Sequence, residues 1–219
     1  MNIKYFGQSC IQIKTKDVIL IIDPYSSEIG LKLPNLRADM VLVTHSHSDH
    51  NNVSAVKPRE KNKQVSQFMG AGEFEHSGVL VQGIPSWHDD KQEQKNYMYS
   101  VYVDHIRIAH LGDLGQKTLY DEQLEQLNNV DILFVPVGGK YTINGEEAFE
   151  ITNQIDPKIV IPIHYKVLGL EVELDTADKF LKLEGKEPQV LDELKVEKEN
   201  LPKEEEREVI VLNVSSKGE

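Results

Sequence analysis

Short apolar runs, each bounded by turn-forming or charged residues, recur along the chain and predict buried β-strands. They cover residues 18–22, 40–43, 79–81, 99–103, 106–109, 132–135 and 159–163. The first residues of the chain and the alternating segment around Cys10 predict two further strands, and 209–212 predicts a last one. Asp104-His105 separates two of these runs, which predicts a hairpin that turns at this pair.

Three segments carry apolar residues at helical spacing and predict helices at 118–127, 146–154 and 176–183. The first has leucines at i, i+5 and i+8 and acidic residues in its first turn. Gly185 follows the third segment and is a typical C-terminal stop. Strands and helices mixed in this order, with many strands adjacent in sequence, predict a layered α/β (α+β) fold.

The length of 219 residues predicts one domain, 1–219, that is large enough to bury a sizeable core. The apolar runs stay well short of the roughly 20 residues that a membrane helix needs, so no membrane span is expected. The start lacks the apolar stretch of a signal peptide, and the single cysteine, Cys10, excludes an intramolecular disulfide. Both features predict a cytoplasmic protein in which Cys10 is a buried, inert thiol.

The formal net charge of -12 repels phosphate backbones. Nucleic acid is therefore a disfavoured partner, although bound divalent cations would add local positive charge that the formal count omits. We expect a small-molecule substrate and no membrane partner, and the sequence leaves a homo-oligomer open. The Lys- and Glu-rich segment 184–207 is expected to form a solvated face or loop.

Three histidines and one carboxylate stand within six positions shortly after the apolar run 40–43. They are His45, His47, Asp49 and His50. Neutral imidazole and carboxylate suit Zn²⁺, Mn²⁺ or Fe, and packing does not require four such groups side by side. Imidazoles held close together also lower one another's basicity, which keeps them unprotonated and able to bind a cation. This segment predicts half of a metal site.

Three more candidate ligands, His88, Asp113 and His164, stand at or just beyond the ends of other apolar segments. A sheet that presents several strand ends at one rim is a rigid scaffold for a site built from loops. Together the candidates comprise five histidines and two aspartates, enough for two cations with open positions for water. Two such cations lower the pKa of bound water and polarise an electrophile, so they predict hydrolysis without a protein nucleophile.

The segment 45–50 resembles the His-x-His-x-Asp-His signature of the metallo-β-lactamase-fold hydrolases, and the later histidines and aspartate follow the order of that superfamily. The similarity extends over nearly the whole chain, from Phe6-Gly7-Gln8-Ser9-Cys10 to Pro162-Ile163-His164-Tyr165. It is greatest to the short, single-domain branch that includes ascorbate-6-phosphate lactonase. The resemblance implies a four-layer αβ/βα sandwich with the site along one edge of two packed sheets.

The resemblance also implies a role for each candidate ligand and a cofactor of two divalent metal ions. The first metal would be held by His45, His47 and His88, the second by Asp49, His50 and His164, and Asp113 would bridge them. Asp49 would also orient the attacking water, so Asp49 and Asp113 are the expected catalytic residues. Zinc is favoured by the histidine-rich ligand set, with manganese or iron as alternatives.

Four further residues are candidates for supporting or substrate-binding roles: Asp23, His110, Asn96 and Tyr165. Asp23 resembles the carboxylate that holds a ligating imidazole from behind, with an ordinary turn residue as the alternative. His110 is expected either behind the ligands or facing substrate, with core packing as the alternative. Asn96 is expected in a loop near the site, and Tyr165 either binds an anionic group or lies at the periphery. The pair Gly138-Gly139 predicts a close approach of backbone.

These features together predict a metal-dependent hydrolase in which hydroxide on a dinuclear centre attacks an ester-like bond, without a covalent intermediate. A small phosphorylated or lactone-type metabolite is the substrate that the resemblance implies. A phosphodiesterase or nuclease on the same fold and a non-catalytic metal-binding sensor are the alternatives. Oxygen-reducing di-iron proteins share this scaffold, but they carry a glutamate where this chain has His47 and need a flavin domain that 219 residues cannot house.

Overall fold

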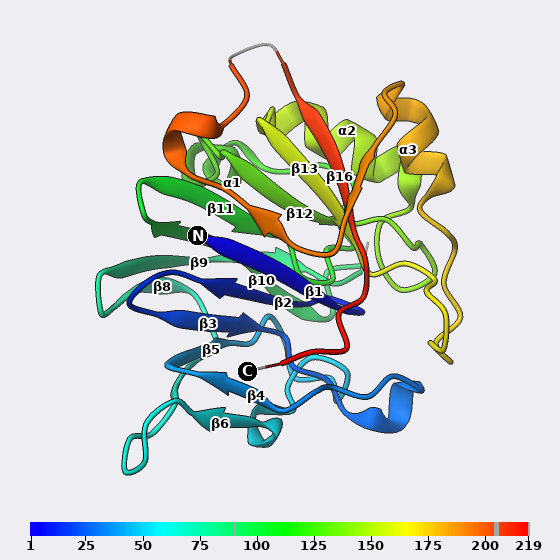
Figure 1. The fold of residues 1–219 in the computed structure, drawn as a ribbon. Helices are drawn as coiled ribbons and strands as arrows, with labels where there is room; N and C mark the ends of the chain where they lie inside the picture. The colour runs from blue at the N-terminus through cyan, green and yellow to red at the C-terminus, as the bar shows by residue number, and fades with distance from the viewer. Residues whose placement is uncertain (90, 204–205, 219) are drawn as a thin grey trace.

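Two mixed β-sheets lie face to face in the computed structural model, which describes residues 1–89, 91–203 and 206–218 (Figure 1). The six-stranded sheet contains, in spatial order, β15 (Leu194–Lys195), β1 (Asn2–Gly7), β2 (Cys10–Lys14), β3 (Ile19–Ile22), β5 (Met40–Leu42) and β7 (Ser66–Phe68). The eight-stranded sheet contains β14 (Gln189–Leu191), β16 (Glu208–Leu212), β13 (Ile159–Ile163), β12 (Ile132–Pro136), β11 (Ile106–His110), β10 (Lys95–Val103), β9 (Val79–Trp87) and β8 (Gly72–His76). A small sheet pairs β4 (Leu36–Ala38) with β6 (Val56–Pro58).

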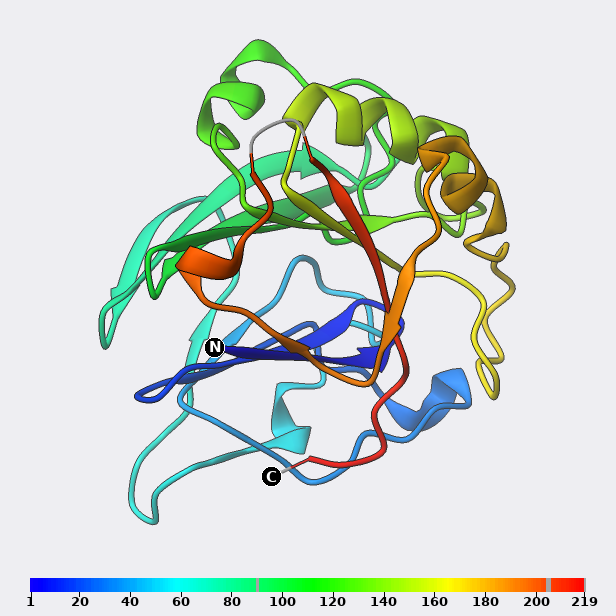
Figure 2. The ribbon, with the colours of Figure 1, turned by 45° about the horizontal axis from the view of Figure 1, so that its top comes forward.

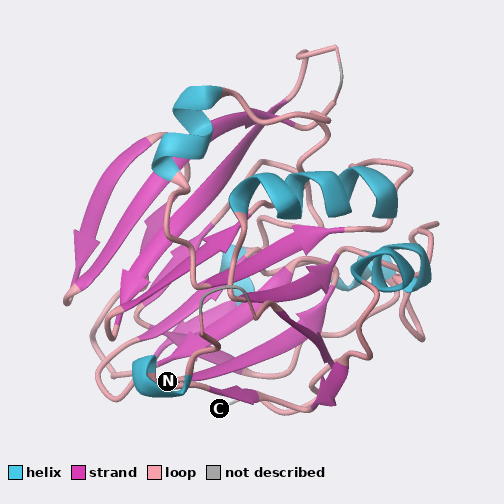
Figure 3. Ribbon diagram, turned by 90° about the horizontal axis from the view of Figure 1, so that it is seen from above, coloured by secondary structure: helices cyan, strands magenta, loops and turns pink. Residues whose placement is uncertain are grey.

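Helices cover the outer face of the eight-stranded sheet, as Figure 2 and Figure 3 show. They are α1 (Asp121–Gln126), α2 (Gly145–Ile155) and α3 (Asp178–Glu184). The outer face of the six-stranded sheet carries the 3-10 turns η1 (Ser27–Ile29) and η2 (Val53–Ala55) together with the small sheet; a third turn, η3 (Lys198–Asn200), precedes β16. The predicted sandwich is confirmed, and its fourth layer is made of short turns and strands.

The strand β3 shows why the apolar runs of this chain do not alternate with polar residues. Its Leu20 and Ile22 lie in the core between the two large sheets. Its Ile19 and Ile21 lie in a second apolar cluster on the outer face, which includes Ile29 of η1. All four side chains are buried because both faces of the sheet are covered, so the strand reads as a continuous apolar run.

The strands that carry the candidate ligands all point the same way within their sheets. In the eight-stranded sheet, β11, β12 and β13 are parallel, and β9 has the same direction because two antiparallel steps separate it from β11. In the six-stranded sheet, β1, β3 and β5 share one direction. The loops that follow β5, β9, β11 and β13 therefore reach one rim of the sandwich, as predicted.

The predicted elements agree with the structure except at their ends. β10 and β11 form the predicted hairpin, and Asp104 and His105 at its turn have positive φ angles of 50° and 62°. The helix predicted at 118–127 begins at Asp121, because the Gln123 side chain accepts the backbone N–H of Tyr120 and caps the helix there. The segment 184–207, expected as a solvated face or loop, instead contributes β14 and β15 to the edges of the two large sheets and contains η3; its positions 204 and 205 lie outside the described residues. None of the described helices has the length and apolar character needed to cross a bilayer.

Candidate metal centre

The seven side chains expected to bind metal lie together at the rim where the four ligand-bearing strands end. One group, with ligand atoms within 4.8 Å of one another, consists of His45, His47 and His88. A second group meets the same limit and consists of Asp49, His50, Asp113 and His164. Except for exposed His47 and half-buried Asp49, these side chains are buried. The first group has the members that the sequence resemblance assigns to one cation, and the second has the members assigned to the other cation together with Asp113.

One oxygen of Asp113 lies at the centre of the two groups. Four imidazole Nε2 atoms face Asp113 Oδ2, at 3.1 Å from His50, 3.2 Å from His164, 3.5 Å from His88 and 3.9 Å from His45. A neutral imidazole has one N–H and one lone pair, and a carboxylate oxygen has room for about two hydrogen bonds. Hydrogen bonds within the protein therefore cannot satisfy all four nitrogens at this oxygen, whereas cations placed among them could.

Asp23 determines which nitrogen of two imidazoles carries the proton. Its Oδ2 lies 3.0 Å from His50 Nδ1, and because a carboxylate only accepts, neutral His50 donates from Nδ1 and keeps a lone pair on Nε2. The Thr44 hydroxyl donates to the same oxygen at 2.7 Å, so it accepts from His45 Nδ1 at 3.0 Å. In their neutral forms both imidazoles thus direct an unprotonated Nε2 toward Asp113, which is the arrangement expected behind metal-ligating histidines.

The pKa values describe a cluster in which an ionised carboxylate is surrounded by imidazoles that cannot all be charged. Burial lowers the pKa of His45 to about 3, and the charge of His50 acts in the same direction. Burial also lowers the pKa of His50, but Asp113 and Asp23 outweigh it and raise this pKa well above its usual value. Burial raises the pKa of Asp113, yet His164 and His50 hold it well below its usual range. Asp113 is therefore held ionised at the centre, beside imidazoles of which His45 stays neutral.

The residues present fit a pair of divalent cations. His50 Nε2 and His164 Nδ1 are buried and have no partner in hydrogen-bond geometry among the described residues. A buried polar atom without a partner costs free energy, and in His50 that atom is the one aimed at the centre. Imidazole nitrogens with carboxylate oxygens are the donor set of zinc sites and also suit manganese or iron.

Backbone strain and close approach position the ligand-bearing segments. Asp23 and His164 both have positive φ angles, 52° and 49°, which non-glycine residues adopt only at a cost. A Cβ on Gly138 would lie 2.2 Å from the carbonyl oxygen of His164, so only glycine lets these two loops approach so closely. The close approach predicted at Gly138-Gly139 is thus present, and it packs directly against a candidate ligand.

The remaining candidates hold the backbone of the site or lie behind it. Asn96 lies in β10 and not in a loop as expected, because its backbone pairs with Ser86 of β9. It accepts the backbone N–H of Asp113 at 3.1 Å and donates to the carbonyl of Leu111 at 2.8 Å. His110 is fully buried, and its Nε2 donates to the carbonyl of Ser9 at 2.9 Å, so it does not face the cavity. Tyr165 stacks on a core tyrosine and is not among the described residues that line the cavity next to the cluster.

Three residues that contact the cluster were not singled out from the sequence. Thr44 joins Asp23 to His45 as described above. Gln8 Nε2 donates to Asp49 Oδ2 at 2.8 Å, and Ser9 Oγ donates to Asp113 Oδ1 at 3.3 Å. Gln8 and Ser9 follow β1, which ends at the same rim as β5, so the strand-end argument that found the ligands also applies to them.

A cavity of about 460 Å³ opens onto both ligand groups. It is lined by His47, Ser48, Asp49, His88, Gln94, Asp113, Tyr141, His164 and Val172. A second cavity, of about 320 Å³, shares His47 and Gln94 with it and adds Lys95 and Tyr97. Volumes of this order are typical of sites for small molecules.

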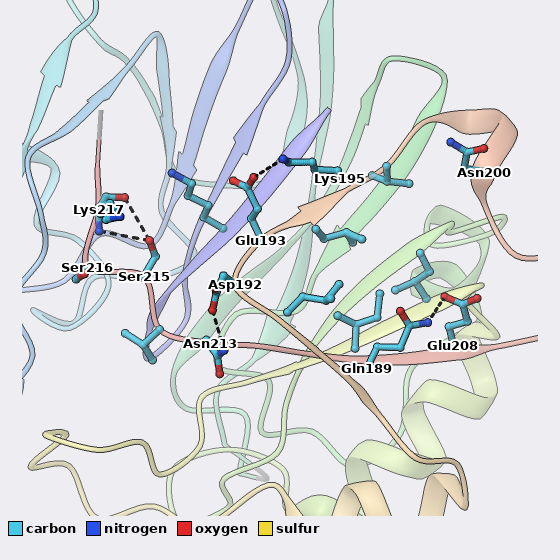
Figure 4. A pocket seen from close by; sticks show the side chains of 17 residues that line it. Gln189, Asp192, Glu193, Lys195, Asn200, Glu208, Asn213, Ser215, Ser216 and Lys217 are labelled. Carbon is cyan, nitrogen blue, oxygen red and sulfur yellow. Dashed lines mark hydrogen bonds and ion pairs between the residues drawn. The ribbon is translucent and has the colours of Figure 1, made fainter.

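A larger cavity, of about 830 Å³, lies away from the cluster, along β14, β16 and the segment 213–217 (Figure 4). Its polar side chains pair with one another: Asn213 donates to Asp192 at 2.9 Å, and Lys195 lies 3.0 Å from Glu193. No histidine or cysteine is among the described residues that line it. We therefore place the chemistry at the smaller cavity beside the His/Asp cluster.

Comparison with known proteins gives a consistent assignment. A model of the beta-lactamase superfamily domain matches residues 2–164. A UPF0173 protein of Pyrococcus abyssi is 30% identical and covers 77% of this chain and 85% of its own length. The UPF0173 metal-dependent hydrolase YtkL of Bacillus subtilis is 27% identical, with 75% and 86% covered. The solved structure of a proposed Zn-dependent hydrolase of the metallo-beta-lactamase superfamily from Thermotoga maritima superposes with a TM-score of 0.79 at 31% identity, over 96% of this chain and 97% of that one. The chain belongs to the metallo-β-lactamase superfamily and, within it, to the UPF0173 family of metal-dependent hydrolases.

Proposed function

We propose that this chain is a hydrolase with a dinuclear divalent-metal centre that cleaves an ester-like bond in a small metabolite. One observation carries the proposal: four imidazoles surround Asp113 Oδ2 at distances between 3.1 and 3.9 Å, directly beside a cavity of small-molecule size. Seven nitrogen and oxygen donors in this arrangement support two cations that share one carboxylate.

Each ligand group would hold one cation. The first would be bound by His45, His47 and His88, the second by Asp49, His50 and His164, with Asp113 between them. When bound, the cations supply Lewis acidity, which lowers the pKa of water and polarises the bond to be cleaved. Asp23 directly keeps the His50 ring in the tautomer that presents a free Nε2. Through the Thr44 hydroxyl it does the same for His45.

Asp49 is the residue that we expect to orient the attacking water. Its side chain is partly exposed to the cavity, and Gln8 occupies its Oδ2 at 2.8 Å, which leaves Oδ1 available to a water molecule. Burial raises the pKa of Asp49, but His50, whose Nε2 lies 3.4 Å from Asp49 Oδ2, outweighs burial and places the pKa well below its usual value. Asp49 is therefore ionised at neutral pH and can accept a hydrogen bond from water.

The walls of the two cavities support a small substrate more than a nucleic acid. Of the described residues that line them, only Lys95 carries a fixed positive charge. Nucleic-acid binding draws its affinity from several phosphate contacts, which these walls do not provide. Tyr141, which is 55% exposed, and Gln94 offer hydrogen-bonding groups at the mouth. A lactone or a small phosphorylated ester, the substrate class of the branch that the sequence resembles, is compatible with this size and polarity.

Zinc is the metal that we favour, because nitrogen donors dominate both ligand groups and the Thermotoga maritima relative is a proposed Zn-dependent hydrolase. Manganese or iron are the alternatives, since Asp49 and Asp113 add carboxylate oxygens to the donor set.

An activity screen tests the proposal. The protein, loaded with zinc or with manganese, is assayed against lactones, phosphodiesters, thioesters and phosphorylated sugars, with Asp113→Ala as the matched inactive variant. We expect turnover of at least one ester-like class that disappears in Asp113→Ala. Preference for a phosphodiester such as bis-p-nitrophenyl phosphate would favour the phosphodiesterase alternative. A protein that binds metal and hydrolyses none of these classes would overturn the enzyme and favour a metal sensor.

A further inference from the structure

The turn between β1 and β2 is fixed in place from several sides. The carbonyl oxygen of Gln8 accepts from the Tyr5 hydroxyl at 2.8 Å and from the backbone N–H of His164 at 2.7 Å. The carbonyl oxygen of Ser9 accepts from His110 Nε2 at 2.9 Å. His110 in turn accepts the backbone N–H of Gly112 on its Nδ1, so the same ring joins the turn to the loop that carries Asp113. The main-chain carbonyls of the turn are thus held against two ligand-bearing loops, through the backbone of His164 and through the His110 ring.

From this position the turn contacts both carboxylates of the proposed metal centre. Gln8 Nε2 donates to Asp49 Oδ2 at 2.8 Å, and Ser9 Oγ lies 3.3 Å from Asp113 Oδ1. A carboxylate has no proton to donate, so the amide of Gln8 must present its nitrogen to Asp49. In Asp113 the oxygen held by Ser9 is Oδ1, and the other oxygen faces the four imidazoles.

Gln8 is an unfavourable residue for the fold at this position. Its φ angle is 52°, in the left-handed region that a side chain adopts only with strain. The side chain is fully buried, and its Oε1 has no hydrogen-bond partner among the described residues. A methionine would fill similar space without an unsatisfied polar atom. In the part of the chain that the structure describes, the interaction of this side chain that an apolar residue could not supply is the hydrogen bond to Asp49.

We propose that Gln8 is a positioning residue that fixes the Asp49 carboxylate within the metal centre, and that Ser9 assists Asp113 in the same way. The inference rests on the metal centre proposed above. Loss of a hydrogen bond behind a ligating side chain lowers metal affinity or activity by about 10–100-fold. Among the described residues, the Gln8 side chain hydrogen-bonds only to the carboxylate assigned to the second cation, so its loss should weaken one of the two sites and leave the other nearly unchanged.

The direct test is a Co²⁺ titration of the metal-free protein, followed by visible absorption spectroscopy, on wild type, Gln8→Met and a matched control. The control is Gln12→Met, because Gln12 is also a buried glutamine of the same hairpin, with its Nε2 unpartnered among the described residues. We expect Gln8→Met to lose about 10–100-fold in affinity for one Co²⁺ and to change its d–d absorption band, because a ligand carboxylate has moved. Gln12→Met should keep both affinities and the wild-type spectrum.

Further measurements distinguish a variant that does not fold from a wrong role for Gln8 and from an absent metal centre. Circular dichroism of the metal-free proteins shows whether Gln8→Met has folded; if it has not, Gln8→Asn, whose amide is too short to reach Asp49, should show the same selective loss. Two Co²⁺ affinities within about twofold of wild type, with an unchanged spectrum, would overturn the role of Gln8 and leave the metal centre intact. Wild-type protein that takes up no Co²⁺ would overturn the metal centre itself, and the inference with it.

Discussion

Replacing Asp23 by Asn should weaken metal binding, although Asp23 is not itself a proposed metal ligand. Asp23 acts through the imidazoles that it orients. The Oδ1 atom of Asp23 accepts the backbone N–H of Thr44 at 2.8 Å, so the amide oxygen of an asparagine would stay on that side. Its NH₂ group would then face His50 Nδ1 and the Thr44 hydroxyl. Neutral His50 would have to accept at Nδ1 and carry its proton on Nε2, which removes the lone pair aimed at the centre.

The size of the effect follows from how many ligands depend on Asp23. Substitutions of such supporting carboxylates cost about 10–100-fold in metal affinity, which corresponds to about 1.4–2.7 kcal/mol. Asp23 Oδ2 orients His50 directly and His45 through the Thr44 hydroxyl, so we expect Asp23→Asn at the upper end of this range and with both cations weakened.

Competition for Zn²⁺ between the metal-free protein and a chromophoric chelator measures this loss. Asp39→Asn is the matched control, because Asp39 also accepts a backbone N–H, from Ile19 at 2.8 Å, but lies just before β5 at the end away from the cluster. Zinc affinities for Asp23→Asn that equal those of Asp39→Asn would refute the proposed control of the imidazole tautomers.

Three more substitutions test separate parts of the structure. Asp113→Ala removes the carboxylate that both ligand groups surround, so metal content measured by mass spectrometry should fall from about two ions per chain toward none; an undiminished hydrolysis rate would mean that the bridging assignment is wrong. Gly138→Ala places a Cβ 2.2 Å from the His164 carbonyl and should lower the free energy of unfolding in urea by about 1–3 kcal/mol while weakening metal binding; wild-type values of both would contradict the close approach. Asp131 accepts a backbone N–H at 3.0 Å and a lysine ammonium at 2.9 Å, so Asp131→Asn should cost about 1–3 kcal/mol in the same urea assay with metal content unchanged. Burial raises the pKa of Asp131, but its hydrogen bonds and lysine neighbours outweigh burial and lower this pKa. The contribution of Asp131 to the free energy of unfolding is therefore complete above the unfolded-state pKa of about 3.9 and is lost as the pH falls through the folded-state pKa. The difference in stability between wild type and Asp131→Asn should accordingly shrink at acid pH.

The positions of the candidate ligands could be predicted because strand direction constrains where residues meet. His88, Asp113 and His164 each follow an apolar run, and parallel strands bring their carboxyl ends to one rim. Their order along the chain and the signature at 45–50 then indicated which residues share a cation. The strand-end inference needed only local patterns and a general rule of sheet topology, whereas the assignment of each ligand to a cation came from the resemblance to the superfamily.

The hydrogen bonds that support the ligands could not be predicted in this way. Gln8 and Asp49 are 41 positions apart, and Ser9 and Asp113 are 104 apart, so no local pattern connects them. The sequence also left His110 undecided between a role behind the ligands or toward substrate and ordinary core packing. The structure shows that it holds main-chain atoms, and that role depends on a turn whose conformation only the folded chain defines.

The elements missed by the periodicity are the shortest ones. β4, β6 and β7 each span three residues, which is too few for an alternating pattern to be recognised. The packing of β4 and β6 on the six-stranded sheet nevertheless explains why Ile19 and Ile21 are apolar, since these side chains need a cover on the outer face. The sequence therefore predicted the class of fold more securely than the composition of its outer layer.

The most direct measurement is the metal content of the purified wild-type chain after equilibration with zinc and removal of free metal, with Asp113→Ala treated in parallel. If the two His/Asp groups form a dinuclear centre, wild type should retain about two zinc ions per chain and Asp113→Ala should retain close to none. Wild-type protein that retains no metal, or a variant that retains both ions, would contradict the dinuclear centre from which the proposed hydrolysis follows.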